Sequence, residues 1–319
     1  MKEKIIAIVG PTASGKTGLS IRLAKELNGE IVSCDSMQIY QGMCIGTAAP
    51  TVEEMDGIPH HLFGFVPPDH EFSVADYREK AAECIASIIA RGRMPILCGG
   101  TGLYLDSLLR VSEFSEVAKS DDLRRELTEY AAANGNEALH ARLAEVDPAS
   151  AEAIHPNNVR RVVRALEMYH LTGVTKTEWD MRSLTQDSPY DARIIALDFH
   201  DRTILHRRIE MRVDQMMEQG LEAEVRALYD AGLLQPKSIA GQAIGYKEFL
   251  PYLARECTLT AVVDEIKGAT RRYARRQLTW FRRYENALWL YPDTDGDPDA
   301  PLKSADELVR QVLDSGYLT

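Results

Sequence analysis

The segment GPTASGKT at residues 10–17 has the composition and spacing of a loop that binds phosphate groups. It follows the apolar run IIAIV and matches G-x-x-x-x-G-K-[S/T], in which backbone N–H groups surround the phosphates. Lys16 would neutralise their charge, and the hydroxyl of Thr17 could reach Mg²⁺. The usual ligand of such a P-loop is a nucleotide such as ATP, but the loop itself recognises only linked phosphates. The rest of the chain must identify the ligand.

Two further polar residues follow apolar runs, Asp35 in CDSMQIY and Thr101 in GGTGLY. The Asp35 carboxylate could accept a proton or hydrogen-bond an amine, or it could orient Mg²⁺ and its water, as acidic residues do in kinases. Thr101 could bind the same substrate, or it could cap the helix that follows it. The residues alone leave both pairs of alternatives open.

Short apolar runs alternate with helical patterns in the first third of the chain. We predict strands in KIIAIVG, EIVSCDS and MPILCGGTG, with helices in KTGLSIRLAKELN and SVADYREKAAECIASIIARG. This alternation is typical of a parallel sheet with helices on both faces, the α/β class. Because such sheets bind ligands at the carboxyl ends of their strands, Gly10, Asp35 and Thr101 should emerge at one edge.

The pattern changes to helical periods without a convincing strand between about Lys119 and Met181. Strands return at ARIIALDF and at NALWLYP, residues 192–199 and 286–292. We therefore predict a core formed by residues 1–118 and 190–319, and a helical insertion domain at 119–189.

Composition limits the cellular setting that we expect. No apolar run approaches the roughly 18 residues that a membrane span needs, and the phosphate loop leaves no room for a signal peptide. The five cysteines are scattered without a C-x-x-C pair, as in proteins with reduced thiols. His60 and His61 are more typical of a loop or core element than of a metal site. We expect a cytoplasmic protein without a membrane partner, and nothing in the sequence requires more than a monomer.

The net charge of −11 argues against a nucleic-acid partner, but local charge decides binding. The segment 267–283 holds seven basic residues and no acidic one. Such a run is often a solvated face, yet like charges one turn apart destabilise a helix unless an anion meets them. A polyanion is therefore the economical partner. On a helix, an arc of about 140° would hold six arginines: Arg271, Arg272, Arg275, Arg276, Arg282 and Arg283.

A second basic cluster lies in NNVRRVVRALE, at the last strongly helical stretch of the insertion. It contains Arg160, Arg161 and Arg164. Two separate basic elements indicate a long anion rather than one small metabolite.

Motifs in a fixed order span nearly the whole chain. They are GPTASGKT, DSMQIY, IGTAAP, PHHLFG, FSVADY, GGTGLYL, IHPNNVRRVVRALE, AIGYKE and RRQLTWFRR. In these motifs the chain resembles the tRNA dimethylallyltransferase family, also called the IPP transferase family. The resemblance implies a P-loop core with an inserted all-helical domain, and Mg²⁺ as cofactor. The implied reaction transfers the dimethylallyl group of dimethylallyl diphosphate to N6 of the adenosine 3′ to the anticodon, in tRNAs that read codons beginning with U.

The resemblance also implies roles for single residues. Asp35 would bind N6 and accept its proton, Thr101 would contact the same region, and Thr17 would bind the metal ion. The diphosphate of the donor would be held by Gly10, Pro11, Thr12, Ala13, Ser14, Gly15, Lys16, Thr17 and Arg212.

Several segments match those that touch the tRNA anticodon stem-loop in the family. Two positions depart from its pattern, since Ala49 stands where lysine is common and Gln242 where arginine is frequent. The implied tRNA contacts are Asp35, Ser36, Met37, Gln38, Thr101, Arg124, Arg160, Arg161, Arg164, Gln242, Gly245, Tyr246, Lys247, Arg275, Arg276, Gln277, Thr279, Trp280 and Arg282.

Three other functions would use parts of the same sequence. An isopentenyltransferase for free adenine nucleotides would share the catalytic core but would not need a basic surface of this length. A small-molecule P-loop kinase would explain the loop and Asp35 but not the arginine-rich helix. A non-catalytic RNA-binding module would leave the phosphate loop idle.

Overall fold

The computed structural model describes residues 2–110, 120–185, 188–235, 238–293 and 302–318. The chain forms two compact units, one of Met1–Leu108 with Tyr190–Thr319 and the other of Leu109–Pro189. The first boundary therefore falls at Leu109, ahead of the predicted 119, and residues 111–119 lie outside the described residues.

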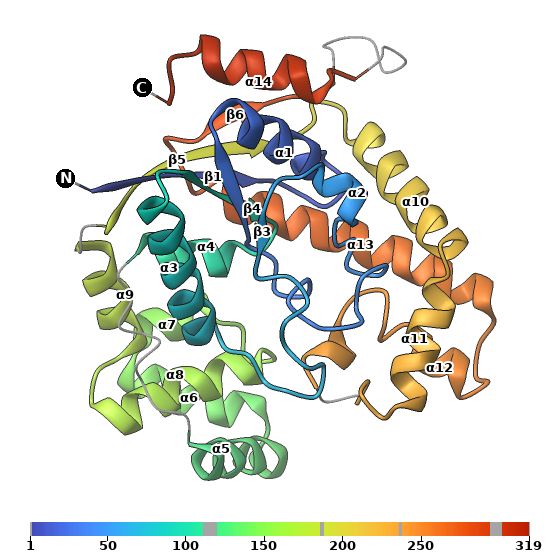
Figure 1. Cartoon of the computed structure of the whole chain (residues 1–319). Helices are drawn as coiled ribbons and strands as arrows, with labels where there is room; N and C mark the ends of the chain where they lie inside the picture. The colour runs from blue at the N-terminus through green and yellow to red at the C-terminus, as the bar shows by residue number, and fades with distance from the viewer. Residues whose placement is uncertain (1, 111–119, 186–187, 236–237, 294–301, 319) are drawn as a thin grey trace. The chain divides into compact units, whose positions relative to one another are not determined.

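The first unit is built on a six-stranded sheet in the order β3-β2-β4-β1-β5-β6 (Figure 1). Every neighbouring pair of strands is parallel, as predicted. The middle of the sheet is buried on both faces, which explains the uninterrupted apolar run of β1. The strands are β1 (Glu3–Val9), β2 (Gly29–Ser33), β3 (His60–His61), β4 (Met94–Gly99), β5 (Tyr190–Leu197) and β6 (Leu288–Leu290).

Strand β3 was not predicted. His60 and His61 pair with Ile31 and Val32 of β2 and form a short edge strand of the core sheet. A strand of two residues is too short to produce a period in the sequence.

Helices cover this sheet and extend beyond it. Helices α1 and α14 share one apolar cluster with the strands, and α3 packs on β2 and β4. Figure 1 shows α13 as a long helix that runs past the sheet toward α12. The helices of this unit are α1 (Lys16–Glu26), α2 (Val52–Met55), α3 (Val74–Ala90), α4 (Gly102–Leu109), α10 (Arg202–Glu218), α11 (Leu221–Asp230), α12 (Phe249–Leu253), α13 (Leu259–Phe281) and α14 (Ala305–Asp314), with a 3₁₀ turn η2 (Ala240–Gln242).

Helix α13 is the element that carries the basic segment. The Thr258 hydroxyl accepts the N–H of Ala261 and caps its start. Ala274 and Leu278 pack in an apolar cluster with residues of α10, including Ile209. The arginine-rich half of the helix is thereby attached to the core along one face.

The second unit contains only helices in its described residues. Their apolar faces meet in a small core that includes Leu127, Leu143 and Leu166. This unit is all-helical, like the predicted insertion. Its helices are α5 (Asp121–Asn134), α6 (Asn136–Val146), α7 (Pro148–Ala153), α8 (Val159–Thr172) and α9 (Lys176–Thr185).

None of the helices in the described ranges is long and apolar enough to cross a membrane.

Candidate active site

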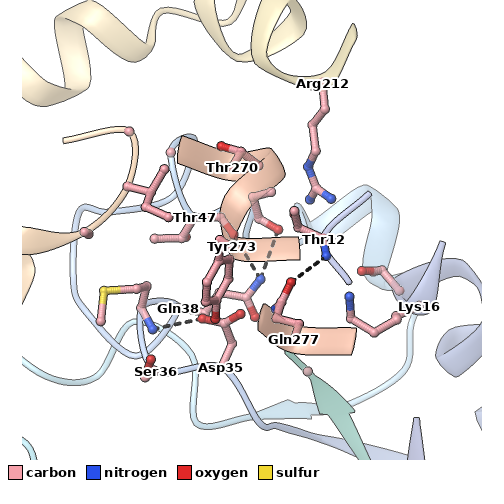
Figure 2. A pocket seen from close by; sticks show the side chains of 18 of the residues that line it. Thr12, Lys16, Asp35, Ser36, Gln38, Thr47, Arg212, Thr270, Tyr273 and Gln277 are labelled. Atoms are coloured by element: carbon pink, nitrogen blue, oxygen red, sulfur yellow. Dashed lines mark hydrogen bonds between the residues drawn. The ribbon is translucent and has the colours of Figure 1, made fainter. Parts of the chain in front are cut away.

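A cavity of about 340 Å³ opens in the first unit, beside the ends of β2 and β4 (Figure 2). Its walls come from the phosphate loop, the turn after β2, the loop before α2, and helices α10 and α13. The residues of the predicted site that line it are Thr12, Lys16, Thr17, Asp35, Ser36, Met37, Gln38, Arg212, Gln242, Gly245, Lys247, Arg276 and Gln277.

The phosphate loop turns sharply between β1 and α1. Gly10, Ala13 and Gly15 all have positive φ angles, of 149°, 63° and 97°. The first turn of α1 receives no side-chain cap from Gly15, so its leading N–H groups are available to an anion. Arg208 supports the loop from α10, because its Nε donates to the Ala13 carbonyl at 2.7 Å. Sequence reasoning missed Arg208, whose neighbours in HRRIEMR are equally basic.

Two half-buried cations face the cavity, Lys16 and Arg212 (Figure 2). The Lys16 amine donates to the Pro11 carbonyl at 2.7 Å, and burial lowers its pKa to about 8. Burial also lowers the pKa of Arg212. Neither side chain forms an ion pair in the part of the chain that is described. An anion between them would restore the charged state that burial disfavours.

Asp35 lies at the carboxyl end of β2 and lines the cavity. Its Oδ1 accepts the N–H of Met37 at 2.9 Å, which holds the carboxylate in the turn. The Thr101 Oγ accepts the N–H of Ser36 at 3.0 Å and donates to the Ser36 hydroxyl at 3.2 Å. Thr101 therefore supports the turn that carries Asp35. Its direct contact with a substrate stays a prediction.

Gln38 holds the facing wall of the cavity. Its amide nitrogen donates to the carbonyls of Thr47 and Ala48 at 3.2 and 3.1 Å, and its oxygen accepts the Ser33 hydroxyl at 3.2 Å. With these partners the Gln38 amide shapes the loop 46–50. A tRNA contact of its side chain would have to replace one of them.

Glu224 of α11 anchors the same wall from behind. Its carboxylate accepts the N–H groups of Cys44, Ile45 and Gly46 at 2.9, 2.8 and 3.1 Å. The Tyr246 hydroxyl also donates to it at 2.6 Å, and the Tyr246 side chain is fully buried. Tyr246 thus lies behind the wall and does not line the cavity. No motif in the sequence singled out Glu224.

One face of α13 closes the cavity, with Thr270, Tyr273 and Gln277 pointing inward (Figure 2). The Tyr273 hydroxyl interacts with Thr101, and burial with the nearby Asp35 charge raises the pKa of the phenol. Tyr273 therefore stays protonated and can donate a hydrogen bond. The sequence motifs assign this tyrosine no role in the site.

The structure corrects the expectation that the six arginines of the segment 267–283 lack acidic partners; α13 holds four of them, and Arg282 and Arg283 follow its end. Acidic residues from other turns and elements pair with four of the six, which a helical projection of one segment cannot reveal. These pairs are Arg271–Glu210 at 2.5 Å, Arg272–Glu265 at 2.6 Å, Arg282–Asp198 at 3.4 Å and Arg283–Asp106 at 2.6 Å. Arg275 and Arg276 are exposed and form no ion pair within the described residues.

The predicted arginines of the second unit fall into two groups. Arg124 and Arg164 bind the buried Glu167 carboxylate, at 2.8 and 2.6 Å. Arg160 and Arg161 are exposed at the start of α8, and neither pairs with an acid in the described ranges. The unpaired surface charge of this unit is therefore smaller than its sequence indicates.

The other predicted residues of the first unit do not line the cavity within the described part of the chain. The Trp280 ring packs against Gly102, and the Thr279 hydroxyl donates to the Arg275 carbonyl. The predicted residues of the first unit that do not line the cavity are Gly10, Pro11, Ala13, Ser14, Gly15, Thr101, Tyr246, Arg275, Thr279, Trp280 and Arg282.

The described residues contain no group of three or more histidine, cysteine, aspartate or glutamate side chains that could hold a metal ion. The oxygen donors that line the cavity include the Thr17 hydroxyl and the Asp35 carboxylate. Hard oxygen donors suit Mg²⁺, which keeps several waters and binds proteins chiefly through one or two carboxylates and substrate phosphates. The donor set therefore fits a magnesium ion that arrives with a phosphate ligand.

A parallel α/β sheet whose cavity holds two half-buried cations without an ion pair in the described residues is suited to a phosphate-bearing ligand. The model of the IPP transferase family matches residues 38–284, and a model described as isopentenyl transferase matches residues 3–62. The chain therefore belongs to the IPP transferase family and is a transferase.

Curated relatives are similar over nearly the whole chain. The tRNA dimethylallyltransferase of Halalkalibacterium halodurans is 48% identical over 314 residues, which are 98% of this chain and 99% of the relative. That of Geobacillus thermodenitrificans is 47% identical and covers 98% and 97%.

Solved structures agree with this assignment. A full-length tRNA isopentenylpyrophosphate transferase from Bacillus halodurans is 45% identical with a TM-score of 0.72, covering 99% of this chain and 97% of that one. A eukaryotic dimethylallyltransferase acting on tRNA is 31% identical with a TM-score of 0.77, covering 91% and 74%.

Proposed function

We propose that this transferase moves the dimethylallyl group of dimethylallyl diphosphate to N6 of the adenosine 3′ to the anticodon, in tRNAs that read codons beginning with U. The products are N6-dimethylallyladenosine in the tRNA and free diphosphate. The observation that carries the proposal is one cavity that joins two unpaired cations, a carboxylate and the inner face of a basic helix.

The leaving group would occupy the phosphate loop. As N6 attacks the allylic carbon, the bond from that carbon to the diphosphate oxygen breaks, and its electron pair leaves with the diphosphate. Lys16 and Arg212 stabilise the charge that develops on the departing oxygens. Thr17 would hold Mg²⁺, which supplies further positive charge to the diphosphate when bound.

The attacking amine would lie beside Asp35. Adenine N6 is a poor nucleophile, so its position relative to the allylic carbon matters more than early deprotonation. Once the C–N bond forms, N6 carries a positive charge and gives a proton to the Asp35 carboxylate. The Met37 N–H and the Ser36 turn hold that carboxylate in place.

The dimethylallyl group itself needs an apolar surface. Ile209, Val213 and Met216 of α10 and Ile266 of α13 line the same cavity. These side chains exclude water from the allylic carbon, where attack by water would hydrolyse the donor.

The target adenosine must leave the anticodon loop to reach this cavity, at a cost of a few kcal/mol. Arg275 and Arg276, exposed on α13, are the basic residues of this unit best placed to meet RNA phosphates. Because tRNA is the proposed acceptor, we propose the cytoplasm as the compartment. A monomer suffices, since one chain supplies the cavity.

The test is an incubation with labelled dimethylallyl diphosphate and three acceptors in parallel: unmodified tRNA, AMP and ATP. Label should enter tRNA alone. Label in AMP or ATP but not in tRNA would instead identify a nucleotide isopentenyltransferase, and transfer of phosphate from ATP to a small molecule would identify a kinase.

A further inference from the structure

The side chain of Gln277 joins α13 to two loops of the catalytic cavity (Figure 2). Its Oε1 accepts the N–H of Thr12 in the phosphate loop at 3.0 Å. Its Nε2 donates to the carbonyl of Gly100, just after β4, at 3.0 Å. The Gln277 side chain is buried, and its hydrogen bond to Gly100 lies away from competing water, whereas its bond to Thr12 is half-buried at the cavity wall.

The loop after β4 is shaped to receive this helix. A Cβ at Gly100 would lie 2.1 Å from the Gln277 amide nitrogen, and one at Gly102 would lie 2.1 Å from the Trp280 ring. Only glycine allows such an approach at these positions. The GGTG and RQLTW segments, far apart in the sequence, therefore form one contact.

The outer side of the same helical turn carries the unpaired charge. Arg275 and Arg276 precede Gln277 directly and are exposed, and Arg276 also lines the cavity. Tyr273 lies four residues before Gln277, on the same face, next to Asp35. If RNA phosphates displaced this turn of α13, the phosphate loop would move with it, because the Gln277 amide is bonded to Thr12.

We propose that Gln277 is a positioning residue that couples the two substrate sites, so that RNA bound on α13 tightens the phosphate loop around diphosphate. This inference rests on the proposed function, because it takes the α13 arginines as RNA contacts. It also gives Gln277 a role other than the direct tRNA contact that the family resemblance implies.

The amide is the group that this role requires. Thr12 offers a donor and Gly100 an acceptor, so the bridging side chain must accept at one end and donate at the other. Glutamate would accept from Thr12 but present a second acceptor to the Gly100 carbonyl. Leucine has nearly the same shape and would make neither bond.

The experiment measures linkage in the full-length protein with ligands that cannot react together. The dissociation constant of inorganic diphosphate is measured with and without saturating unmodified anticodon stem-loop RNA, and that of the RNA with and without diphosphate. The variants are Gln277→Leu and Gln277→Glu, with Gln311→Leu on α14 as a matched control at an exposed glutamine.

In the wild type, each ligand should tighten the other by the same factor, within about 5–150-fold. In Gln277→Leu the factor should fall to near one, and diphosphate alone should bind about tenfold more weakly. Gln277→Glu should keep part of the diphosphate affinity but lose most of the coupling. Gln311→Leu should behave as the wild type.

A coupling factor near one in the wild type would overturn the inference, as would an unchanged factor in Gln277→Leu. A melting temperature lowered in both Gln277 variants, with diphosphate and RNA weakened equally and the factor retained, would show a purely structural role. Failure of the proposed function is distinct, because the wild type would then transfer no label to tRNA whatever the Gln277 variants do.

Discussion

At the scale of single residues, the site depends on two cations, Lys16 and Arg212, whose charged forms are disfavoured by burial. Lys16 and Arg212 face the cavity with lowered pKa values; the Asp35 charge acts on both, but neither forms an ion pair in the described part of the chain. Such an arrangement costs stability unless a ligand completes it. Donor binding therefore supplies the counter-charge that the fold omits.

The lowered pKa of Lys16 predicts how donor binding depends on pH. In the free protein the amine loses its proton above about pH 8, whereas bound diphosphate favours the charged amine and raises its pKa. Affinity for dimethylallyl diphosphate, measured by calorimetry without tRNA, should be constant below pH 8. Above pH 8 the affinity should weaken, approaching a tenfold loss per pH unit, and binding should be accompanied by proton uptake. A constant affinity from pH 7 to 9.5 would contradict this assignment.

Asp35 and Lys16 should affect different kinetic constants. Asp35→Asn removes the proton acceptor, so the transfer rate at saturating donor and tRNA should fall about 10²–10³-fold. Lys16→Ala should mainly weaken donor binding. Asp69→Asn, at an exposed loop aspartate, is the matched control. A near-wild-type rate for Asp35→Asn would remove this carboxylate from the chemistry.

At the scale of elements, α13 has an exposed basic face and an inner face that lines the cavity. Of the six arginines of the segment 267–283, four are neutralised by acids from other turns or elements, whereas Arg275 and Arg276 on α13 remain exposed and without an ion pair within the described residues. The electrostatic attraction for RNA should therefore come from one turn rather than from the whole basic segment.

This division predicts unequal effects of charge reversal along the helix. Arg276→Glu should weaken tRNA binding and flatten the slope of log K against log salt by about 0.7–0.9 for each phosphate that the side chain no longer neutralises. Arg272→Glu, at an arginine paired with Glu265, should change the slope much less. Binding across a salt series measures both, and equal slopes for the two variants would contradict the division.

In the helical unit, one buried carboxylate organises the basic residues. Glu167 accepts from Arg124, Arg164 and the Ser120 N–H; burial opposes its ionised form, but these hydrogen bonds lower its pKa overall. Glu167→Gln should reduce the free energy of unfolding by about 1–3 kcal/mol. Glu129→Gln, on the exposed face of α5, should have little effect.

The pH dependence gives an independent check on Glu167. Because its folded pKa lies below the usual 4.5, its contribution is present above that value and is lost as pH falls through the folded pKa. The stability difference between wild type and Glu167→Gln should therefore shrink below pH 4.5. A difference that stays constant to pH 3 would show that this carboxylate is not held by its arginines.

At the scale of the whole molecule, the sequence predicted the parallel core and the helical insertion because both rest on local periods and on the phosphate loop. It could not predict contacts between distant segments. The sequence around Glu224 does not indicate that this carboxylate accepts three backbone N–H groups of a distant loop. Likewise, the sequence around Glu210 does not indicate its ion pair with Arg271. Gln277 stood in a recognisable motif, but its partners Thr12 and Gly100 follow only from the fold.

Transfer to N6 of the adenosine 3′ to the anticodon is tested most directly by locating the attached dimethylallyl group in the RNA. The enzyme is incubated with dimethylallyl diphosphate and an unmodified anticodon stem-loop, and the RNA is digested to nucleosides for mass spectrometry. A second stem-loop carries guanosine in place of the adenosine 3′ to the anticodon. We predict N6-dimethylallyladenosine from the first RNA, with one diphosphate released per modified base, and none from the second. Modified adenosine from the second RNA, or diphosphate release without modified RNA, would contradict the account.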